Sequence, residues 1–227
     1  MALRTRLEAV EERLRAACAR SGRPRGGVTL VAVTKSVTAE VAALLPALGV
    51  HDLGENRPQE LWRKAELIPS VRWHLIGHLQ RNKIERTLPL VHAFHSVDSI
   101  RLLTALDAAG VDTSHSPLVL LEINASREAN KQGFAPEEVP DLVPTLAALK
   151  RLRVAGLMTM AANEEDPERC RPTFVLLRTL RDRLEQELGT PLPHLSMGMT
   201  NDYEVAVEEG ATLLRIGTAL LGDLSVG

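Results

Sequence analysis

The chain has 227 residues, of which 44% are apolar and 25% are charged, and its formal net charge is −2. This composition is typical of a globular protein with a sizeable core, and it lacks the basic excess of proteins that bind nucleic acids or anionic membranes. Three Phe, two Trp and one Tyr are too few to stack a row of bases. No apolar run is long enough to cross a bilayer, and the N-terminus lacks the apolar block of a signal peptide. We therefore expect a cytoplasmic protein. Two cysteines are also too few to form a zinc site by themselves.

Eight short apolar or β-branched segments recur along the chain, and each is followed by a polar or glycine-containing turn. They cover residues 29–34, 50–53, 71–76, 93–97, 118–123, 154–158, 194–197 and 212–216. Helical patterns lie between them, and this alternation is typical of a parallel sheet covered by helices. Eight such units predict a single (β/α)8 barrel domain of the TIM type over residues 1–227. An open doubly wound sheet is the alternative, although no Gly-x-Gly-x-x-Gly turn follows the first strand.

Several of the intervening helices have an apolar stripe or recognisable ends. One precedes the barrel, and its stripe contains Leu3, Leu7, Val10, Leu14 and Ala17. Capping residues, prolines at the first turn and terminal glycines predict the limits of three others. These limits are Asp98 or Ser99 to Gly110, Pro136 to Leu149, and Asp166 to Gly189.

Residues that could take part in binding or catalysis cluster just after the predicted strands. The carboxyl ends of parallel strands meet at one face of a barrel, where this fold holds its active sites. We therefore expect a single site that draws on Lys35, Asn56, Gly77, Ser96, Asn124, Met160, Gly198 and Gly217.

Lys35 directly follows the first predicted strand and is one of five lysines in the chain. A lysine at the mouth of a barrel is expected to be partly buried, which would lower its pKa and free its amine to attack a carbonyl group. The position therefore predicts a Schiff-base lysine. The alternative is a lysine whose ammonium group simply reaches solvent.

The loops after the seventh and eighth predicted strands have the composition of an anion site. Ser196, Gly198 and Thr200 lie in the first loop, and Gly217 and Thr218 lie in the second. Glycine turns that lead into helices present free backbone N–H groups, and these two loops are the recurrent phosphate site of barrels of this type. They predict a phosphate site, with a pair of tight, capped turns as the alternative.

Arg215 lies two residues before Gly217 and therefore projects on the same side of its strand. An inward-facing arginine needs a partner, because an unpaired buried charge is costly. The ring nitrogen of a phosphorylated heteroaromatic cofactor such as pyridoxal phosphate is one candidate. The carboxylate of Glu55 or Glu122 is the other, and spacing alone does not separate these alternatives.

Two histidine pairs have a spacing that a metal site could use, namely His74 with His78 and His92 with His95. The first pair spans a strand and its turn, whereas metal-binding His-Glu-x-x-His pairs lie on a helix. We therefore expect no metal site.

Taken together, the motifs resemble those of the pyridoxal phosphate homeostasis family from Leu30 to near the C-terminus. The matching stretches are VAVTK (31–35), GENRPQE (54–60), WHLIGHLQRNK (73–83), HSVDS (95–99), EIN (122–124), KQGF (131–134), GLMTM (156–160), SMGMTND (196–202) and RIGTA (215–219). Nine matching stretches in one order over most of the chain make a chance similarity implausible.

The resemblance implies a barrel like the N-terminal barrel of alanine racemase, carrying pyridoxal 5′-phosphate as an aldimine on Lys35. It also implies that Arg215 faces the ring nitrogen and that Asn56 lies beside the ring. The residues implied for the phosphate group are Ser196, Gly198, Thr200, Gly217 and Thr218. Thr200 stands where a serine is common in the family, which keeps a hydroxyl group there.

Three functions fit these residues. The resemblance favours a monomeric protein of intracellular vitamin B6 homeostasis, which holds pyridoxal phosphate and passes it on to apo-forms of the enzymes that use it. An amino-acid racemase is the second, but racemisation needs an acid/base group on each face of the substrate. Lys35 could serve one face, whereas Tyr203, the only tyrosine, follows the phosphate loop. Arg215 also disfavours a proton on the ring nitrogen, which weakens the stabilisation of a carbanion. A metal-dependent hydrolase that uses His74 and His78 is the third.

Overall fold

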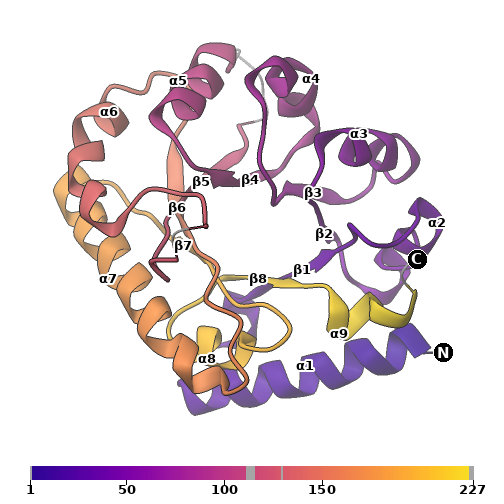
Figure 1. Ribbon diagram of the computed structural model, residues 1–227. Helices are drawn as coiled ribbons and strands as arrows, with labels where there is room; N and C mark the ends of the chain where they lie inside the picture. Colours follow the sequence, from indigo (N-terminus) through magenta and orange to yellow (C-terminus); the bar gives the residue numbers. More distant parts are fainter. Residues whose placement is uncertain (1, 111–115, 129, 225–227) are drawn as a thin grey trace.

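The computed structural model describes residues 2–110, 116–128 and 130–224, in which eight parallel strands close into a barrel in sequence order (Figure 1). The strands are β1 (Thr29–Val33), β2 (Asp52–Glu55), β3 (Arg72–Leu75), β4 (Ala93–Val97), β5 (Leu118–Glu122), β6 (Val154–Met158), β7 (His194–Ser196) and β8 (Leu213–Ile216). Strand β1 pairs with both β2 and β8. The predicted barrel is therefore confirmed, and the open sheet is wrong.

All eight predicted segments overlap strands, but the second one starts too early. Its prediction covered 50–53, whereas β2 runs over Asp52–Glu55 and pairs with β3 from Asp52 onward. Val50 is buried although it precedes the strand, so its apolar character does not mark the strand start. Glu55 consequently lies inside β2, where its side chain is buried.

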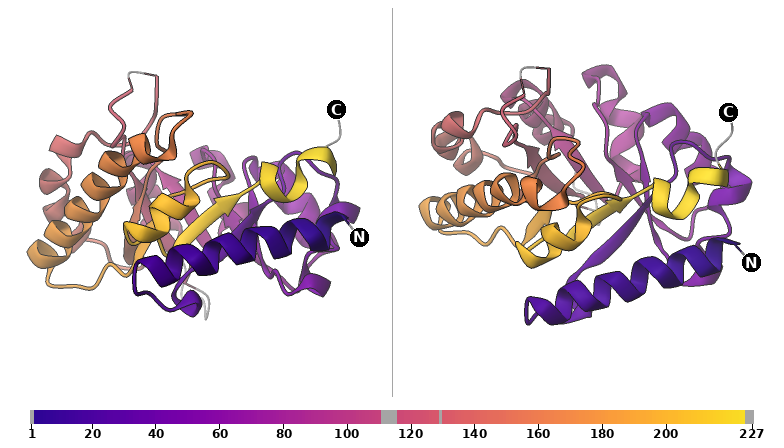
Figure 2. Two further views of the ribbon diagram at one scale, coloured as in Figure 1. Left: turned by 90° about the horizontal axis from the view of Figure 1, so that it is seen from below. Right: turned by 60° about the horizontal axis from the view of Figure 1, so that its bottom comes forward.

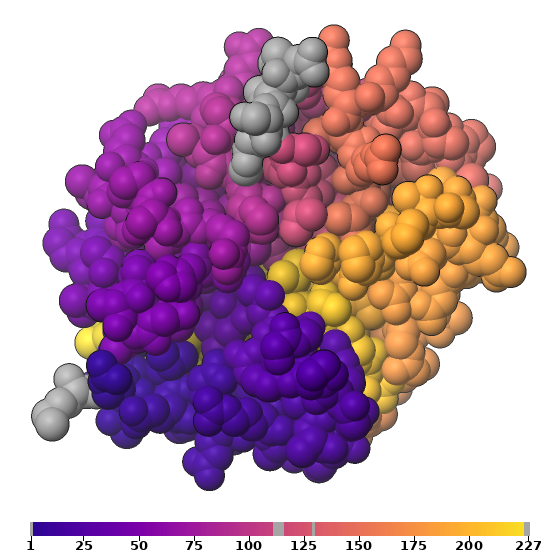
Figure 3. Space-filling view, turned by 180° about the vertical axis from the view of Figure 1, so that it is seen from behind, coloured from indigo at the N-terminus to yellow at the C-terminus, as the bar shows by residue number. Residues whose placement is uncertain are grey.

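Helices surround the barrel (Figures 1 and 2), and the space-filling view from behind shows the segments following one another around the ring in chain order (Figure 3). They are α1 (Ala2–Arg20), α2 (Ala39–Ala42), α3 (Pro58–Leu67), α4 (Ile84–Thr87), α5 (Ile100–Ala109), α6 (Val143–Ala147), α7 (Arg171–Leu188), α8 (Tyr203–Glu208) and α9 (Thr218–Leu221). The predicted N-terminal helix is confirmed: α1 buries its whole apolar stripe and packs beside α8 and α9. Within the described residues, no helix is both long and apolar enough to cross a membrane.

The helix ends follow the predicted capping rules, with one exception. The Ser99 hydroxyl accepts a hydrogen bond from Leu102 N, and Gly189 ends α7 in the left-handed region. The Asp166 carboxylate accepts one from Glu168 N, but it caps the 3₁₀ helix Pro167–Cys170, which precedes α7. The single helix predicted from Pro136 to Leu149 is wrong. That segment forms two short 3₁₀ helices followed by α6, because the prolines at 140 and 144 lack the N–H groups that a continuous helix needs.

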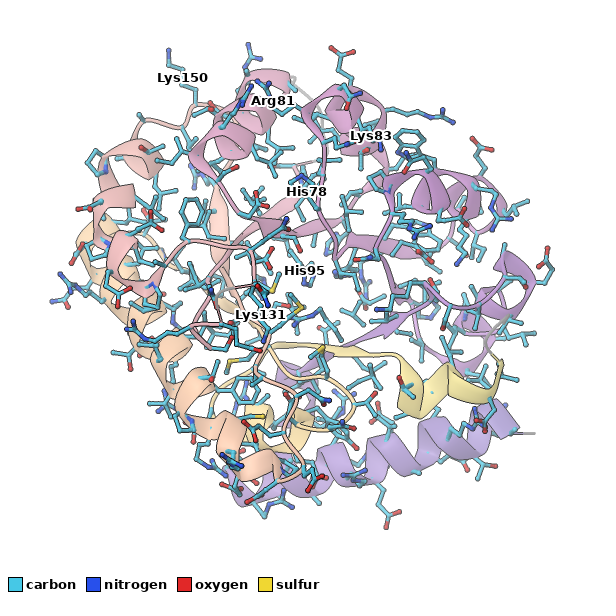
Figure 4. The ribbon with its side chains drawn as sticks, viewed as in Figure 1. His78, Arg81, Lys83, His95, Lys131 and Lys150 are labelled. Carbon is cyan, nitrogen blue, oxygen red and sulfur yellow. The ribbon has the colours of Figure 1, made fainter. Side chains whose placement is uncertain are left out.

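The interior of the barrel is partly polar. His95 on β4 contacts Ser196 on β7, and because these strands are not neighbours the contact crosses the interior. Figure 4 accordingly places His95 near the middle of the ring. A small apolar cluster of Leu120, Met158 and Leu213 stands apart from the main core, which fills the space between the strands and the helices. Barrels of this type usually fill their interior with layers of branched apolar side chains, so the polar residues call for an explanation.

Candidate functional site

A cavity of about 370 Å³ lies at the carboxyl ends of β1, β2, β3, β6, β7 and β8. Loops that are far apart in the sequence and that follow different strands line it together, as Figure 1 lets the reader trace around the ring. Of the residues predicted for the site, it brings together Lys35, Asn56, Thr200, Arg215, Gly217 and Thr218. Its lining does not include five other predicted residues, namely Gly77, Ser96, Asn124, Ser196 and Gly198. The loop from Met160 to Glu164, of which only Met160 was predicted, forms one wall.

Lys35 lines this cavity directly after β1, and its side chain is exposed. It is therefore more open to solvent than we expected. Among the described residues, no hydrogen bond or ion pair within 4.0 Å holds its ammonium group. Its amine is consequently open to a ligand in the cavity.

A second lysine supports the turn that carries Lys35. Lys64 on α3 is 1% exposed, and its Nζ donates to the carbonyl oxygens of Thr34 at 2.8 Å and Val37 at 2.9 Å. Nζ also forms an ion pair with the buried carboxylate of Glu55. Sequence reasoning missed this contact, although Lys64 follows Leu61 by three residues and so occupies the buried stripe of its helix.

Asn56 lies against the turn after β3. A Cβ atom added to Gly77 would lie 2.1 Å from the Asn56 backbone oxygen and 2.2 Å from Asn56 Oδ1. Glycine at position 77 therefore lets this turn approach Asn56, which lines the cavity.

The loop after β7 is shaped by Gly198 and Asp202. Gly198 has a φ of 93°, and Met199 N donates to Asp202 Oδ1 at 2.6 Å. Burial raises the pKa of the Asp202 carboxyl group, although the hydrogen bond from Met199 N lowers it. Thr200 Oγ1 accepts a hydrogen bond of 3.2 Å from Ala219 N, so the loops after β7 and β8 meet as predicted.

Arg215 on β8 is 5% exposed and reaches the cavity wall. Its guanidinium group donates to Ser196 Oγ and, at 2.9 Å, to the carbonyl oxygen of Thr159. The proposed carboxylate partners are not in contact: Glu55 pairs with Lys64, and among the described residues no carboxylate lies within 4.0 Å of Arg215. Burial lowers the pKa of Arg215 to about 10, which leaves it protonated at neutral pH.

The histidines of the two predicted pairs have different surroundings. His74 is buried, with Nε2 2.9 Å from Asp52 Oδ1 and Nδ1 2.9 Å from His95 Nε2. His78 is exposed, and its Nδ1 lies 2.9 Å from Asp98 Oδ2. The structure thus separates His74 from His78, and in the part of the chain that it describes no three His, Cys, Asp or Glu residues are grouped as a metal site.

Comparison with known proteins identifies the family. Residues 5–225 match the family model of the alanine racemase N-terminal domain. The chain is 40% identical over 220 residues to the pyridoxal phosphate homeostasis protein of Aquifex aeolicus, an alignment that covers 96% of each chain. The chain belongs to the pyridoxal phosphate homeostasis family. The predicted resemblance is therefore confirmed.

Solved structures agree with this assignment. The chain superposes with a TM-score of 0.80 on PipY of Synechococcus elongatus, solved with pyridoxal phosphate bound, at 33% identity and with 93% and 99% of the two chains covered. It also superposes on alanine racemase of Clostridium difficile with a TM-score of 0.77. The identity there is 16%, and 56% of that longer chain is covered, so this likeness concerns the barrel fold alone.

Proposed function

We propose that this protein binds pyridoxal 5′-phosphate, holds it covalently on Lys35 and passes it on to apo-enzymes, as a cytoplasmic monomer in vitamin B6 homeostasis. The observation that carries the proposal is one cavity that joins an open lysine amine, a buried arginine and two glycine-containing loops. The family supports it, because a PipY structure contains the same cofactor. A volume of about 370 Å³ also lies in the range of small-molecule sites.

The residues present fit the parts of this cofactor. Thr200 and the backbone of Gly217 and Thr218 would hold the phosphate group, Arg215 would face the ring nitrogen, and Asn56 would lie beside the ring. The Ser196 hydroxyl is engaged by Arg215 and lies outside the cavity lining. We therefore assign Ser196 to the support of Arg215, and we assign Gly198 to the shape of the phosphate loop.

The chemistry that the cofactor supplies when bound is an aldehyde on an electron-withdrawing ring. The Lys35 amine attacks the aldehyde carbon, the aldehyde oxygen leaves as water, and a C=N bond remains between protein and cofactor. Arg215 keeps its positive charge near the ring nitrogen and so disfavours protonation there. This arrangement suits storage of the cofactor better than carbanion chemistry.

Neither of two candidate second bases is suited to a racemase. Tyr203 is 1% exposed and does not line the cavity, and its hydroxyl has no hydrogen-bond partner among the residues that the structure describes. Cys170 lines the cavity, but burial raises the pKa of its thiol to about 11. The racemase alternative predicts exchange of the α-proton of an amino acid with solvent deuterium, and the carrier proposal predicts none above background.

The covalent link is tested by adding pyridoxal phosphate, recording the visible spectrum, reducing with borohydride and mapping the labelled peptide. We expect a Schiff-base band in the wild-type protein and the reduced adduct on Lys35. Lys35→Ala should fold but lose the adduct, whereas Lys150→Ala should keep it, since Lys150 is exposed on the outside of the molecule (Figure 4). An adduct that persists in Lys35→Ala would show that another lysine carries the cofactor.

Handover is tested by mixing the loaded protein with the apo-form of a pyridoxal phosphate enzyme in the presence of a phosphatase that destroys free cofactor. Direct transfer predicts that enzyme activity is restored despite the phosphatase. If the phosphatase abolishes restoration, the protein releases its cofactor only into solution.

A further inference from the structure

The polar interior of the barrel forms a continuous chain of buried contacts. It starts at the cavity wall and ends at the opposite rim, where the guanidinium of Arg72 binds Asp52 through two hydrogen bonds of 2.8 and 2.6 Å. In order, its members are Arg215, Ser196, His95, His74 and Asp52. Each of these five side chains is buried. We propose that these contacts form a one-way hydrogen-bond series, running from Arg215 as donor to Asp52 as acceptor, and that this series positions the Arg215 guanidinium at the cavity.

The direction follows from what each group is able to donate. A guanidinium has only N–H donors, so Ser196 Oγ must be the acceptor toward Arg215. Ser196 is 0% exposed, so its own O–H needs an acceptor within the protein. Its second contact is His95 Nδ1 at 2.7 Å. His95 Nδ1 therefore accepts a hydrogen bond and carries no proton.

The remaining links are then fixed in turn. With Nδ1 unprotonated, His95 must carry its proton on Nε2 and donate to His74 Nδ1 at 2.9 Å. His74 Nδ1 is then an acceptor, and His74 Nε2–H donates to the Asp52 carboxylate at 2.9 Å. Both histidines are thus neutral and share one tautomer, with the proton on Nε2.

The charges of the groups agree with this direction. Burial lowers the pKa of His95 well below its usual value, which favours the neutral ring. For Asp52, burial alone would raise the pKa, but hydrogen bonds from His74 and Arg72 hold it below its usual range. The hydrogen-bond series therefore ends in a stable carboxylate, whose charge polarises each donor that points toward it.

The consequence for Arg215 is a fixed orientation without a carboxylate in contact. Its Nη1 and Nη2 are held by two neutral oxygens, Ser196 Oγ and the Thr159 carbonyl. A carboxylate in contact would offset most of the field of this charge, whereas the two carboxylates that act on it, Asp202 and Glu122, are not in contact with it. On the proposed function, on which this step rests, that charge faces the ring nitrogen of the cofactor.

The test uses the full-length protein without ligand, labelled with ¹⁵N in histidine and arginine. Nitrogen chemical shifts should show both His74 and His95 protonated on Nε2 alone at neutral pH. Ser196→Ala should give His95 a mixture of tautomers and speed the exchange of the Arg215 guanidinium protons with solvent. The matched control is Ser96→Ala, which removes a buried hydroxyl that donates to the Ile76 carbonyl and is not part of the hydrogen-bond series.

Each outcome decides the proposal. A proton on His95 Nδ1, or a doubly protonated His74, in the wild-type protein would overturn the one-way hydrogen-bond series. Equal guanidinium exchange in Ser196→Ala and Ser96→Ala would overturn the positioning role. In a cofactor titration, Ser196→Ala should weaken binding about fivefold relative to Ser96→Ala, as expected for the loss of one buried hydrogen bond. If the wild-type protein binds no cofactor while the ligand-free readouts hold, only the proposed function fails.

Discussion

Gly198 shows how a single residue determines the shape of the predicted phosphate loop. Its φ of 93° lies in the left-handed region that side chains rarely adopt. A Cβ atom there would also lie 2.6 Å from Ala206 Cβ, which is closer than two carbon atoms can approach. Gly22 has a similar φ of 66° but open space around its Cα, so the two positions separate backbone strain from steric clash.

We expect Gly22→Ala to lower the free energy of unfolding by about 1 kcal/mol, through backbone strain alone. Gly198→Ala should lower it by about 2–4 kcal/mol, because overpacking adds to the same strain. Urea denaturation of both variants measures the difference. Equal losses would mean that the loop after β7 relaxes freely around a side chain.

At the scale of elements, the turn after β1 depends on the buried pair of Lys64 and Glu55. Lys64 joins α3 to the carbonyl groups on both sides of Lys35, and Glu55 also accepts a hydrogen bond of 2.7 Å from Thr34 Oγ1. Removing one partner leaves the other charge buried without compensation, which costs about 3–5 kcal/mol in comparable pairs.

We therefore expect Lys64→Met to destabilise the protein by about 3 kcal/mol or more, and Glu55→Gln by a similar amount. The double variant should lose less than the sum of the two, because neither charge is then left alone. Chemical denaturation of the wild type, the two single variants and the double variant gives the interaction energy as a double-mutant cycle. Additive losses would show that the two side chains do not stabilise each other.

Helix α1 is attached to the barrel by both apolar and ionic contacts. Leu14 is 0% exposed in its stripe, and Arg20 pairs with Glu204 and Glu208 on α8. We expect Leu14→Ala to cost about 2–5 kcal/mol through lost burial and a residual cavity. Glu208→Gln also removes an ion pair with Arg171 on α7, yet it should cost only about 1 kcal/mol, because these ion pairs are partly exposed and screened by solvent. Thermal unfolding of the two variants compares them, and a larger loss in Glu208→Gln would reverse this ranking of the contacts.

At the scale of the whole molecule, the barrel was predictable because each strand is short, apolar and ended by a turn. Helix ends were predictable where the cap is local, as at Ser99 and Gly189. The segment after Pro136 was not, because apolar spacing suggested one helix while prolines inside it removed donors. Propensity and periodicity thus locate elements better than they locate interruptions within them.

The cavity lining was predictable to the extent that strand ends converge on one face. Lys35, Asn56 and Thr200 meet there for this reason. The true environment of Ser196 was not predictable, because its partner His95 lies 101 residues away on a strand across the barrel. Local sequence identifies a hydroxyl in a loop, and only the closure of the barrel decides which group it binds.

Closure of the barrel also makes global stability depend on pH through His95. Burial lowers its pKa in the folded protein, whereas in the unfolded chain the pKa is near the usual value of about 6.5. Below that value the unfolded chain binds more protons, so the free energy of unfolding falls as the pH falls. One such group contributes up to about 1.4 kcal/mol per pH unit. His194, whose pKa burial also lowers, acts in the same direction, while Glu122 and Asp202, whose pKa values burial raises, oppose it.

Because these groups act together, the contribution of His95 is measured as a difference. Urea unfolding of the wild type and of His95→Gln between about pH 7.5 and 5.5 gives two slopes of stability against pH. The variant keeps His194, Glu122 and Asp202 but takes up no proton at position 95. We expect its slope to be shallower than that of the wild type by up to about 1.4 kcal/mol per pH unit, whatever its absolute stability. Equal slopes would mean that His95 binds its proton equally well in the folded barrel and in the unfolded chain, which a ring buried between His74 and Ser196 should not allow.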